Sequence, residues 1–152
     1  AAYAAYDKYM QSRKHFNKVR YSAVSQKFIT DVLKLVENDG HKIKYGENEW
    51  FIANKDDLGK HEIFFYDFVY DQKIIEFNGD FYHASPHKYK ADDILHHFNK
   101  SAKEIWDADA YKINIARKHG FDVYIVWEHE YKHDRINCIN NAVNFLQGKS
   151  NL

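Results

Sequence analysis

Two carboxylates stand inside strongly apolar stretches of the sequence. Asp67 shares one face of a predicted strand with hydrophobic residues of the run 63–69, because side chains alternate between the two faces of a strand. Glu76 lies in the same way within the next run, residues 74–78, and the short polar segment 70–73 predicts a hairpin that pairs the two runs. Like charges held close in a half-buried site repel each other, and a shared proton or a divalent cation relieves the repulsion. The pattern predicts a cation site.

A histidine and a third acid could add proton transfer to this site. His83 follows the second run where the strand is expected to pass into a loop, and its unperturbed pKa lies near neutrality. Asp109 falls in the apolar stripe of a predicted helix, and Lys112 is one turn further along. A carboxylate that accepts a hydrogen bond from one ring nitrogen leaves the other nitrogen free to take a proton from water. Each acid could instead cap a loop, and His83 could simply hydrogen-bond its own loop.

An aromatic pair, Phe81 and Tyr82, directly precedes His83. Side chains of this kind at the mouth of a carboxylate site can stack on bases or wedge into a base step. Core packing is the other common fate of such a pair.

The composition is that of one folded domain. Hydrophobic residues make up 45% and aromatic residues 17% of the 152 residues. No apolar run approaches the roughly 18 residues of a membrane span, and no leader pattern opens the sequence, so we expect a cytoplasmic protein without membrane contact. The single cysteine, Cys138, excludes an intramolecular disulfide and a cysteine zinc site.

The charge balance is even overall but uneven along the chain. The 22 basic residues match the 22 acidic ones, yet residues 1–21 contain a basic strip with interleaved aromatic residues. A phosphate backbone suits that composition, so we expect an N-terminal arm that contacts nucleic acid through Arg13, Lys14, Lys18 and Arg20. An ordinary solvated helix or tail is an equal alternative for the strip taken alone.

The periodicity predicts an α/β (α+β) domain over residues 22–148. A helix begins after Ser22 and ends near Asp39-Gly40. Strands are predicted over 41–45, 50–53, 62–70 and 73–78, a long connection over 80–98, a helix over 100–119, a strand over 121–127 and a helix over 136–146. The order α-β-β-β-β-α-β-α predicts a mixed central sheet of about four to five strands flanked by helices.

With these residues in view, the chain resembles the PD-(D/E)XK nuclease superfamily. The strongest stretches are YDFVYDQKIIEFNGDFYH (66–83) and DAYKINIARKHGFDVYIVWE (109–128). They are similar to the very-short-patch repair endonuclease and to phage-type homing endonucleases with an E-D-x-H-D site. The resemblance implies a restriction-endonuclease-like fold.

The resemblance also implies roles for individual residues. Asp67 resembles the metal-binding aspartate, His83 the general base, and Asp109 the acid that pairs with it. Phe81 and Tyr82 fall where the repair enzyme inserts aromatic residues into DNA.

Other positions depart from the repair enzyme or from the wider superfamily. Glu76 agrees with the superfamily, and with the backbone carbonyl of Phe77 it would complete the protein part of a Mg²⁺ shell. Asn78 stands at the variable position of the motif, where the wider superfamily has a lysine, and we expect it to contact DNA. Lys112 is a candidate substitute for the missing lysine. In the first helix Gln26 follows Ser25 where a family glutamate is frequent. The role of that glutamate is weakened or absent here, or is supplied by Glu47 or Glu49.

The activity implied is Mg²⁺-dependent hydrolysis of double-stranded DNA by an endonuclease of homing or repair type with some site specificity. Mn²⁺ is expected to substitute for Mg²⁺, and a homodimer is an open option. Two other functions stay open. A non-catalytic DNA-binding module with a decayed site would explain the missing lysine and glutamate. A metal-dependent RNA nuclease is compatible with the same site, because the inferred chemistry does not read the sugar.

Overall fold

A computed structural model of the chain describes Ala4 and residues 22–149. The expected DNA-contacting residues of the arm, Arg13, Lys14, Lys18 and Arg20, lie outside the described residues. Among those described, no helix has the length and apolar character needed to cross a membrane.

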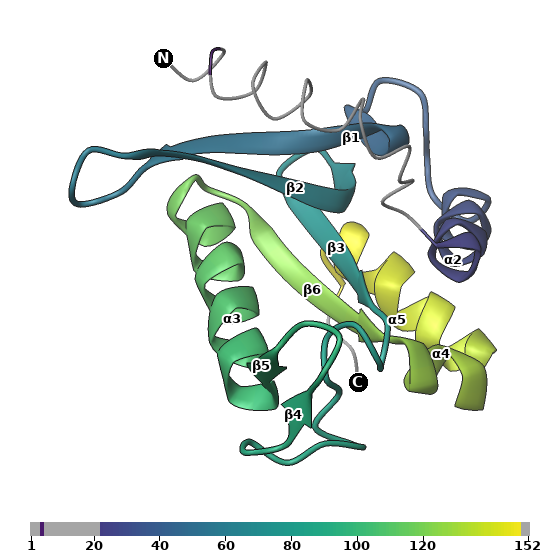
Figure 1. Ribbon diagram of the computed structural model, residues 1–152. Helices are drawn as coiled ribbons and strands as arrows, with labels where there is room; N and C mark the ends of the chain where they lie inside the picture. Colours follow the sequence, from purple (N-terminus) through teal and green to yellow (C-terminus); the bar gives the residue numbers. More distant parts are fainter. Residues whose placement is uncertain (1–3, 5–21, 150–152) are drawn as a thin grey trace.

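A mixed four-stranded sheet forms the centre of the fold, as the sequence predicts (Figure 1). Its order is β1-β2-β3-β6, with antiparallel pairing from β1 to β3 and parallel pairing between β3 and β6. The strands are β1 (Ile43–Lys55), β2 (His61–Tyr70), β3 (Lys73–Asn78) and β6 (Asp122–Trp127). Because β3 and β6 run parallel, their carboxyl ends, at Asn78 and Trp127, lie at the same edge of the sheet.

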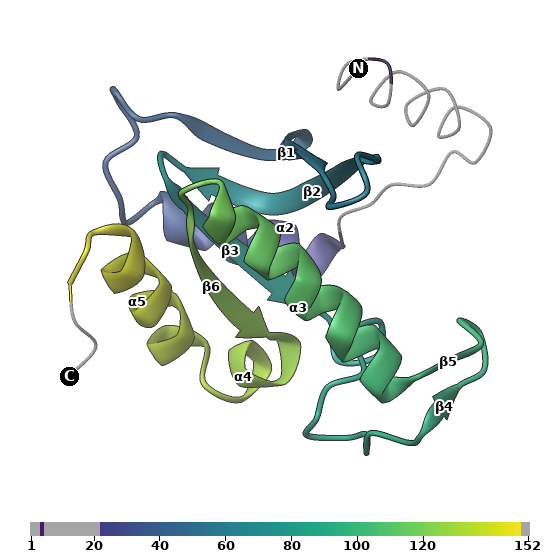
Figure 2. The ribbon, with the colours of Figure 1, turned by 90° about the vertical axis from the view of Figure 1, so that its left-hand side faces the viewer.

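Helices cover both faces of this sheet (Figures 1 and 2). Helix α3 (Ala102–Lys118) packs on one face; α2 (Ala23–Leu33), α4 (Glu128–His133) and α5 (Arg135–Leu146) pack on the other. The long connection from β3 to α3 contains a small hairpin, β4 (Ile94–Leu95) and β5 (Lys100–Ser101). Ser101 caps α3 in a capping box with Glu104, which explains why the helix begins there.

The larger apolar core lies on the α2, α4 and α5 side. Side chains of β2 and β3, such as Phe68, Ile75 and Phe77, pack there against the helices, with Phe28 of α2 fully buried among them. A smaller cluster under α3 contains Val69 and Ile74, the alternate residues of the same strands, and Ile115 and Ala116 of the helix.

Four local features differ from the sequence prediction. The strands expected over 41–45 and 50–53 are one strand, β1, whose register with β2 shifts between Tyr45 and Trp50. Helix α2 ends at Leu33, before the Gly40 that was expected to stop it. The β4–β5 hairpin and the short helix α4 lack a periodic pattern long enough to predict them.

Candidate active site

Asp67 and Glu76 meet where β2 and β3 part. The turn between the strands is as predicted, with Tyr70 opposite Lys73 and Asp71 in the left-handed region at φ 53°. The ladder continues to Phe68 opposite Ile75. Beyond it the Asp67 N–H donates to Glu76 Oε1 (3.0 Å), and the Phe77 N–H donates to Asp67 Oδ2 (2.9 Å). Side-chain carboxylates thus take the place of ladder carbonyls.

Both carboxylates face α3, because they alternate with Phe68, Ile75 and Phe77 of the larger core and share a face with Val69 and Ile74 of the smaller one. Lys112 on α3 donates to Glu76 Oε2 (2.8 Å), and the Glu76 side chain is only 5% exposed. Tyr66 fixes the helix at this point, since its hydroxyl donates to the Lys112 carbonyl (2.8 Å) and its ring lies 4.8 Å from Lys112 Nζ. The ion pair between Lys112 and Glu76 therefore joins helix α3 to strand β3.

The electrostatics of this pair show the cost of burying two acids together. Burial, with the negative charge of Glu76, raises the pKa of Asp67 to about 7. Burial alone would lower the pKa of Lys112, but the charges of Glu76 and Asp67 outweigh it and raise that pKa. A site with two carboxylates and one ammonium favours a further positive charge.

His83 and Asp109 form a hydrogen-bonded pair beside the carboxylates, with 2.8 Å between His83 Nδ1 and Asp109 Oδ2. The backbone N–H of His83 donates to the Gly79 carbonyl (3.1 Å), next to the end of β3. Trp106 Nε1 of α3 donates to the Ala84 carbonyl (2.6 Å), so hydrogen bonds hold the loop both near the strand and to the helix. Burial lowers the pKa of His83, but the hydrogen bond and charge of Asp109 outweigh it, and the pKa is raised.

The predicted residues of the site come together. Asp67 and Glu76 both contribute to the raised pKa of His83, which places the imidazole within their electrostatic reach. Asp109 and Lys112 stand one turn apart on α3, as their spacing predicts. With Nδ1 bonded to Asp109, no described residue hydrogen-bonds to His83 Nε2, so this nitrogen is available to a ligand.

Asp67 and Glu76 offer carboxylate oxygens, which are ligands that Mg²⁺ accepts. Among residues 22–149 no three histidine, cysteine, aspartate or glutamate side chains group in a way that could hold a metal ion. Magnesium commonly uses one or two carboxylates and keeps its remaining ligands as water and substrate phosphate. The Phe77 N–H points to β2, and since the N–H and C=O of one strand residue point to the same neighbour, its carbonyl lies on the Asp67 side as well.

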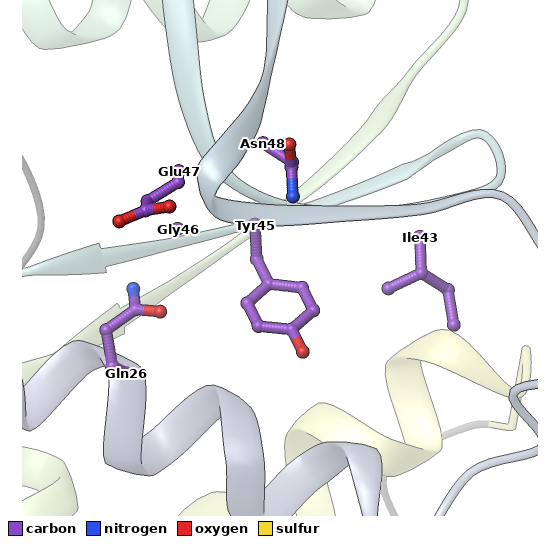
Figure 3. Close-up of a pocket in the computed structure, with 6 residues that line it drawn as sticks. All are labelled: Gln26, Ile43, Tyr45, Gly46, Glu47 and Asn48. Atoms are coloured by element: carbon purple, nitrogen blue, oxygen red, sulfur yellow. The ribbon is translucent and has the colours of Figure 1, made fainter.

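The register shift of β1 lies opposite Asp67, and Gln26 of α2 faces it (Figure 3). A pocket of about 310 Å³ there is lined by Gln26, Ile43, Tyr45, Gly46, Glu47 and Asn48. The Gln26 Oε1 would stand 3.1 Å from a Cβ at Gly46, and Gln26 Nε2 is buried without a hydrogen-bond partner among the described residues. Of the two acids expected to replace the family glutamate, Glu47 lines this pocket.

The aromatic pair, Phe81 and Tyr82, lies on the surface next to the His83–Asp109 pair. Phe81 is 37% and Tyr82 66% exposed, and both rings contact Phe98 in the loop between β4 and β5. A second pocket, of about 270 Å³, is lined by Tyr82, Phe98, Lys100, Ile105, Ala108 and Asp109. Base contact stays a prediction for this pair. Asn78, at the end of β3, is buried, and its DNA contact stays a prediction too.

Sequence reasoning missed a second acid and histidine at the same edge. Asp80 is buried and pairs with His129. Asp80 follows the end of β3 and His129 follows the end of β6, so their meeting could be inferred only once these strands are known to be parallel neighbours.

Comparison with known proteins gives no relative from which a role could be transferred: no family model, no curated protein and no solved structure matches this chain.

Proposed function

We propose that this chain is a Mg²⁺-dependent endonuclease that hydrolyses phosphodiester bonds of double-stranded DNA, of homing or repair type. The supporting observation is the carboxylate pair of half-buried Asp67 and buried Glu76 on the α3 side of the sheet, beside a histidine that a third acid orients. A purely structural role would not require an oriented imidazole next to two repelling acids.

Asp67, Glu76 and the Phe77 carbonyl are the residues that would hold Mg²⁺. Their oxygen atoms are the donors that this cation prefers, and burial together with the charge of Glu76 raises the pKa of Asp67, a cost that a bound cation would relieve. Bound there, the cation would polarise the scissile phosphate and neutralise the charge that develops on it. Mn²⁺, which accepts the same oxygen ligands, is expected to substitute.

His83 acts as the general base. Its Nδ1–H donates to Asp109, which fixes the tautomer and leaves the Nε2 lone pair to take a proton from the attacking water. The negative charge of Asp109 then stabilises the imidazolium. Proton transfer of this kind contributes roughly 10²- to 10⁴-fold to a rate.

Lys112 holds the acid rather than replacing the motif lysine as a base. Its ammonium group donates to Glu76 Oε2, and its raised pKa keeps it charged, so it keeps Glu76 ionised and fixed in orientation. Phe81 and Tyr82, exposed next to His83, are the proposed base contacts, and the basic arm is the proposed contact with more distant phosphates.

A plasmid-nicking assay tests the proposal. We expect supercoiled DNA to be cut with Mg²⁺ and not with EDTA. Asp67→Ala and His83→Ala should abolish cutting while DNA binding, measured in EDTA, stays close to that of the wild type. Matched controls are Asp122→Ala, at the opposite end of β6, and His61→Ala, at the start of β2; both residues are exposed.

The same assay separates the other functions. A non-catalytic module would bind DNA and leave the plasmid intact with either metal. An RNA nuclease would degrade single-stranded RNA faster than duplex DNA under the same conditions. Undiminished cutting by both site variants would refute the assigned residues.

A further inference from the structure

A second histidine is oriented by a buried acid at the carboxyl edge of the sheet. His129 Nδ1 lies 2.7 Å from Asp80 Oδ1, and the Asp80 side chain is only 5% exposed. The His129 side chain is 27% exposed. Nδ1 is hydrogen-bonded to the buried Asp80, and no described residue hydrogen-bonds to Nε2 on the other side of the His129 ring.

Asp80, the acid of this pair, lies in the loop that also bears the proposed base, whereas His129 lies on α4. The Asp80 carbonyl accepts the Ser85 N–H (2.8 Å), and the Gly79 carbonyl accepts the His83 N–H (3.1 Å). His83 and His129 are therefore tied to one compact turn between β3 and α3. A nucleic-acid strand bound at His83 would run along the same edge of the sheet.

Further basic side chains lie around His129. His87 stacks on it with ring centroids 4.5 Å apart and an interplanar angle of 11°, and Lys88 Nζ lies 4.0 Å from Asp80 Oδ2. His87 is exposed, and the Lys88 side chain is 58% exposed. Two imidazoles and an ammonium group thus reach the surface together.

The nearby negative charges are already engaged. Asp80 bonds to His129, while Glu128 pairs with Lys132 (3.1 Å) and accepts the Asp80 N–H (3.3 Å). Glu130, a third acid, lies on α4 and accepts the Trp127 N–H (3.5 Å). With Nδ1–H donated to Asp80, His129 Nε2 donates to a phosphate as an imidazolium, a form that the Asp80 carboxylate and the bound phosphate would both stabilise. Imidazolium and ammonium groups that reach the surface together are suitable donors to the oxygens of a phosphate.

We propose that His129, His87 and Lys88 form a second phosphate subsite, which contacts the backbone of the DNA strand next to the scissile phosphate. The buried Asp80 is a positioning residue that turns His129 Nε2 outward. The subsite rests on the proposed function for its ligand, duplex DNA, but it has no part in the hydrolytic step.

The test is DNA binding without cleavage. Fluorescence anisotropy of a labelled duplex in EDTA would be measured over a salt titration for the wild type, His129→Gln and Lys88→Gln. We expect each variant to bind roughly tenfold more weakly at low salt, as for loss of a hydrogen bond to a charged group. The slope of log affinity against log salt should fall by about 0.9 for each phosphate that is no longer neutralised.

Matched controls are His61→Gln and Lys60→Gln at the exposed turn between β1 and β2, which lies far from α4 in Figures 1 and 2. Both should keep the wild-type affinity and slope. Lys88→Gln guards against a folding artefact, because the side chain is largely exposed and its loss should leave the melting temperature unchanged.

The outcomes separate this proposal from the proposed function. If the pair merely ties the loop to β6, His129→Gln will lower the melting temperature, both variants will keep the wild-type salt slope, and the subsite is refuted even when the wild type cuts DNA. If both variants lose slope and affinity while the wild type fails to cut with Mg²⁺, the subsite stands and the nuclease proposal falls. A wild type that does not bind DNA refutes both.

Discussion

The two faces of the central sheet use the same strands for different purposes. On the side of α2, α4 and α5, Phe68, Ile75 and Phe77 join a continuous apolar core. On the α3 side, the positions between them include Asp67 and Glu76. Because side chains alternate along a strand, one register fixes both faces, and a slip of one residue would place the acids in the core.

The comparison teaches how the buried acids are tolerated. Each Glu76 oxygen has a donor, the Asp67 N–H for one and Lys112 for the other, and Asp67 accepts the Phe77 N–H. A buried charge is costly unless it is paired and hydrogen-bonded, and here the helix supplies the pair. The apolar face stabilises the fold, so the other face can hold repelling charges.

The largest effect on stability should come from the apolar face. Phe28 is fully buried, with ring centroids 5.5 Å from those of both Phe77 and Tyr131. Phe28→Ala should lower the free energy of unfolding by about 3–5 kcal/mol, since it leaves a cavity in the core. Denaturant unfolding measures this, and the exposed Lys27→Ala on the same helix should change it by less than about 0.5 kcal/mol. Equal losses would contradict the division between faces.

A smaller loss of stability is expected on the charged face. Lys112→Met leaves Glu76 buried without its cation and should cost about 3 kcal/mol. Added Mg²⁺ should restore part of that loss, because a bound cation replaces the missing charge. The double variant Lys112→Met with Glu76→Gln should regain stability without responding to Mg²⁺. An absence of any Mg²⁺ effect in thermal melts of the single variant would count against a cation at this position.

A change in the His83–Asp109 pair should alter both the rate of DNA cleavage and the pH dependence of that rate. Asp109→Asn removes the charge that raises the pKa of His83, and we expect cleavage to slow by about 10²-fold. A general base must be unprotonated, so cleavage falls as the pH drops through its pKa. The variant has the lower His83 pKa, and its acidic limb should move to lower pH. A pH–rate profile measures this, and an unmoved limb would show that His83 is not the base.

The smallest effect concerns the single cysteine, which lies in the apolar core. Burial raises the pKa of the Cys138 thiol to about 11, so little thiolate exists near neutral pH. We expect a thiol reagent to react slowly with the native protein and rapidly after denaturation. Fast modification of the native protein would mean that the core on this face opens readily.

Local patterns were sufficient to predict much of the candidate site. The polar segment at Asp71 fixes the hairpin register, and that register sets Asp67 opposite Glu76. Helical spacing sets Asp109 and Lys112 on one side of α3. The relative positions of these residues are set by spacings of only a few residues in the sequence. A periodic pattern reveals spacings of that length.

Long-range pairings were not predictable in the same way. Asp80 and His129 are far apart in the sequence and meet because β3 and β6 are parallel neighbours, which periodicity alone does not reveal. The merging of two predicted strands into β1 follows from a shift of pairing between Tyr45 and Trp50, and such a shift depends on the partner strand. Gly46 and the polar residues that follow it predict a turn between two strands, not one strand with a shift of register.

The central claim is that Asp67 and Glu76 hold a divalent cation beside His83, and Mn²⁺ binding tests it most directly. The His83→Ala variant with duplex DNA should form a stable complex, in which bound Mn²⁺ can be measured by electron paramagnetic resonance. We predict a bound Mn²⁺ signal in this complex, its loss when Asp67→Asn is added, and its persistence with Asp122→Asn. No bound Mn²⁺, or equal binding in the presence of Asp67→Asn, would contradict the account.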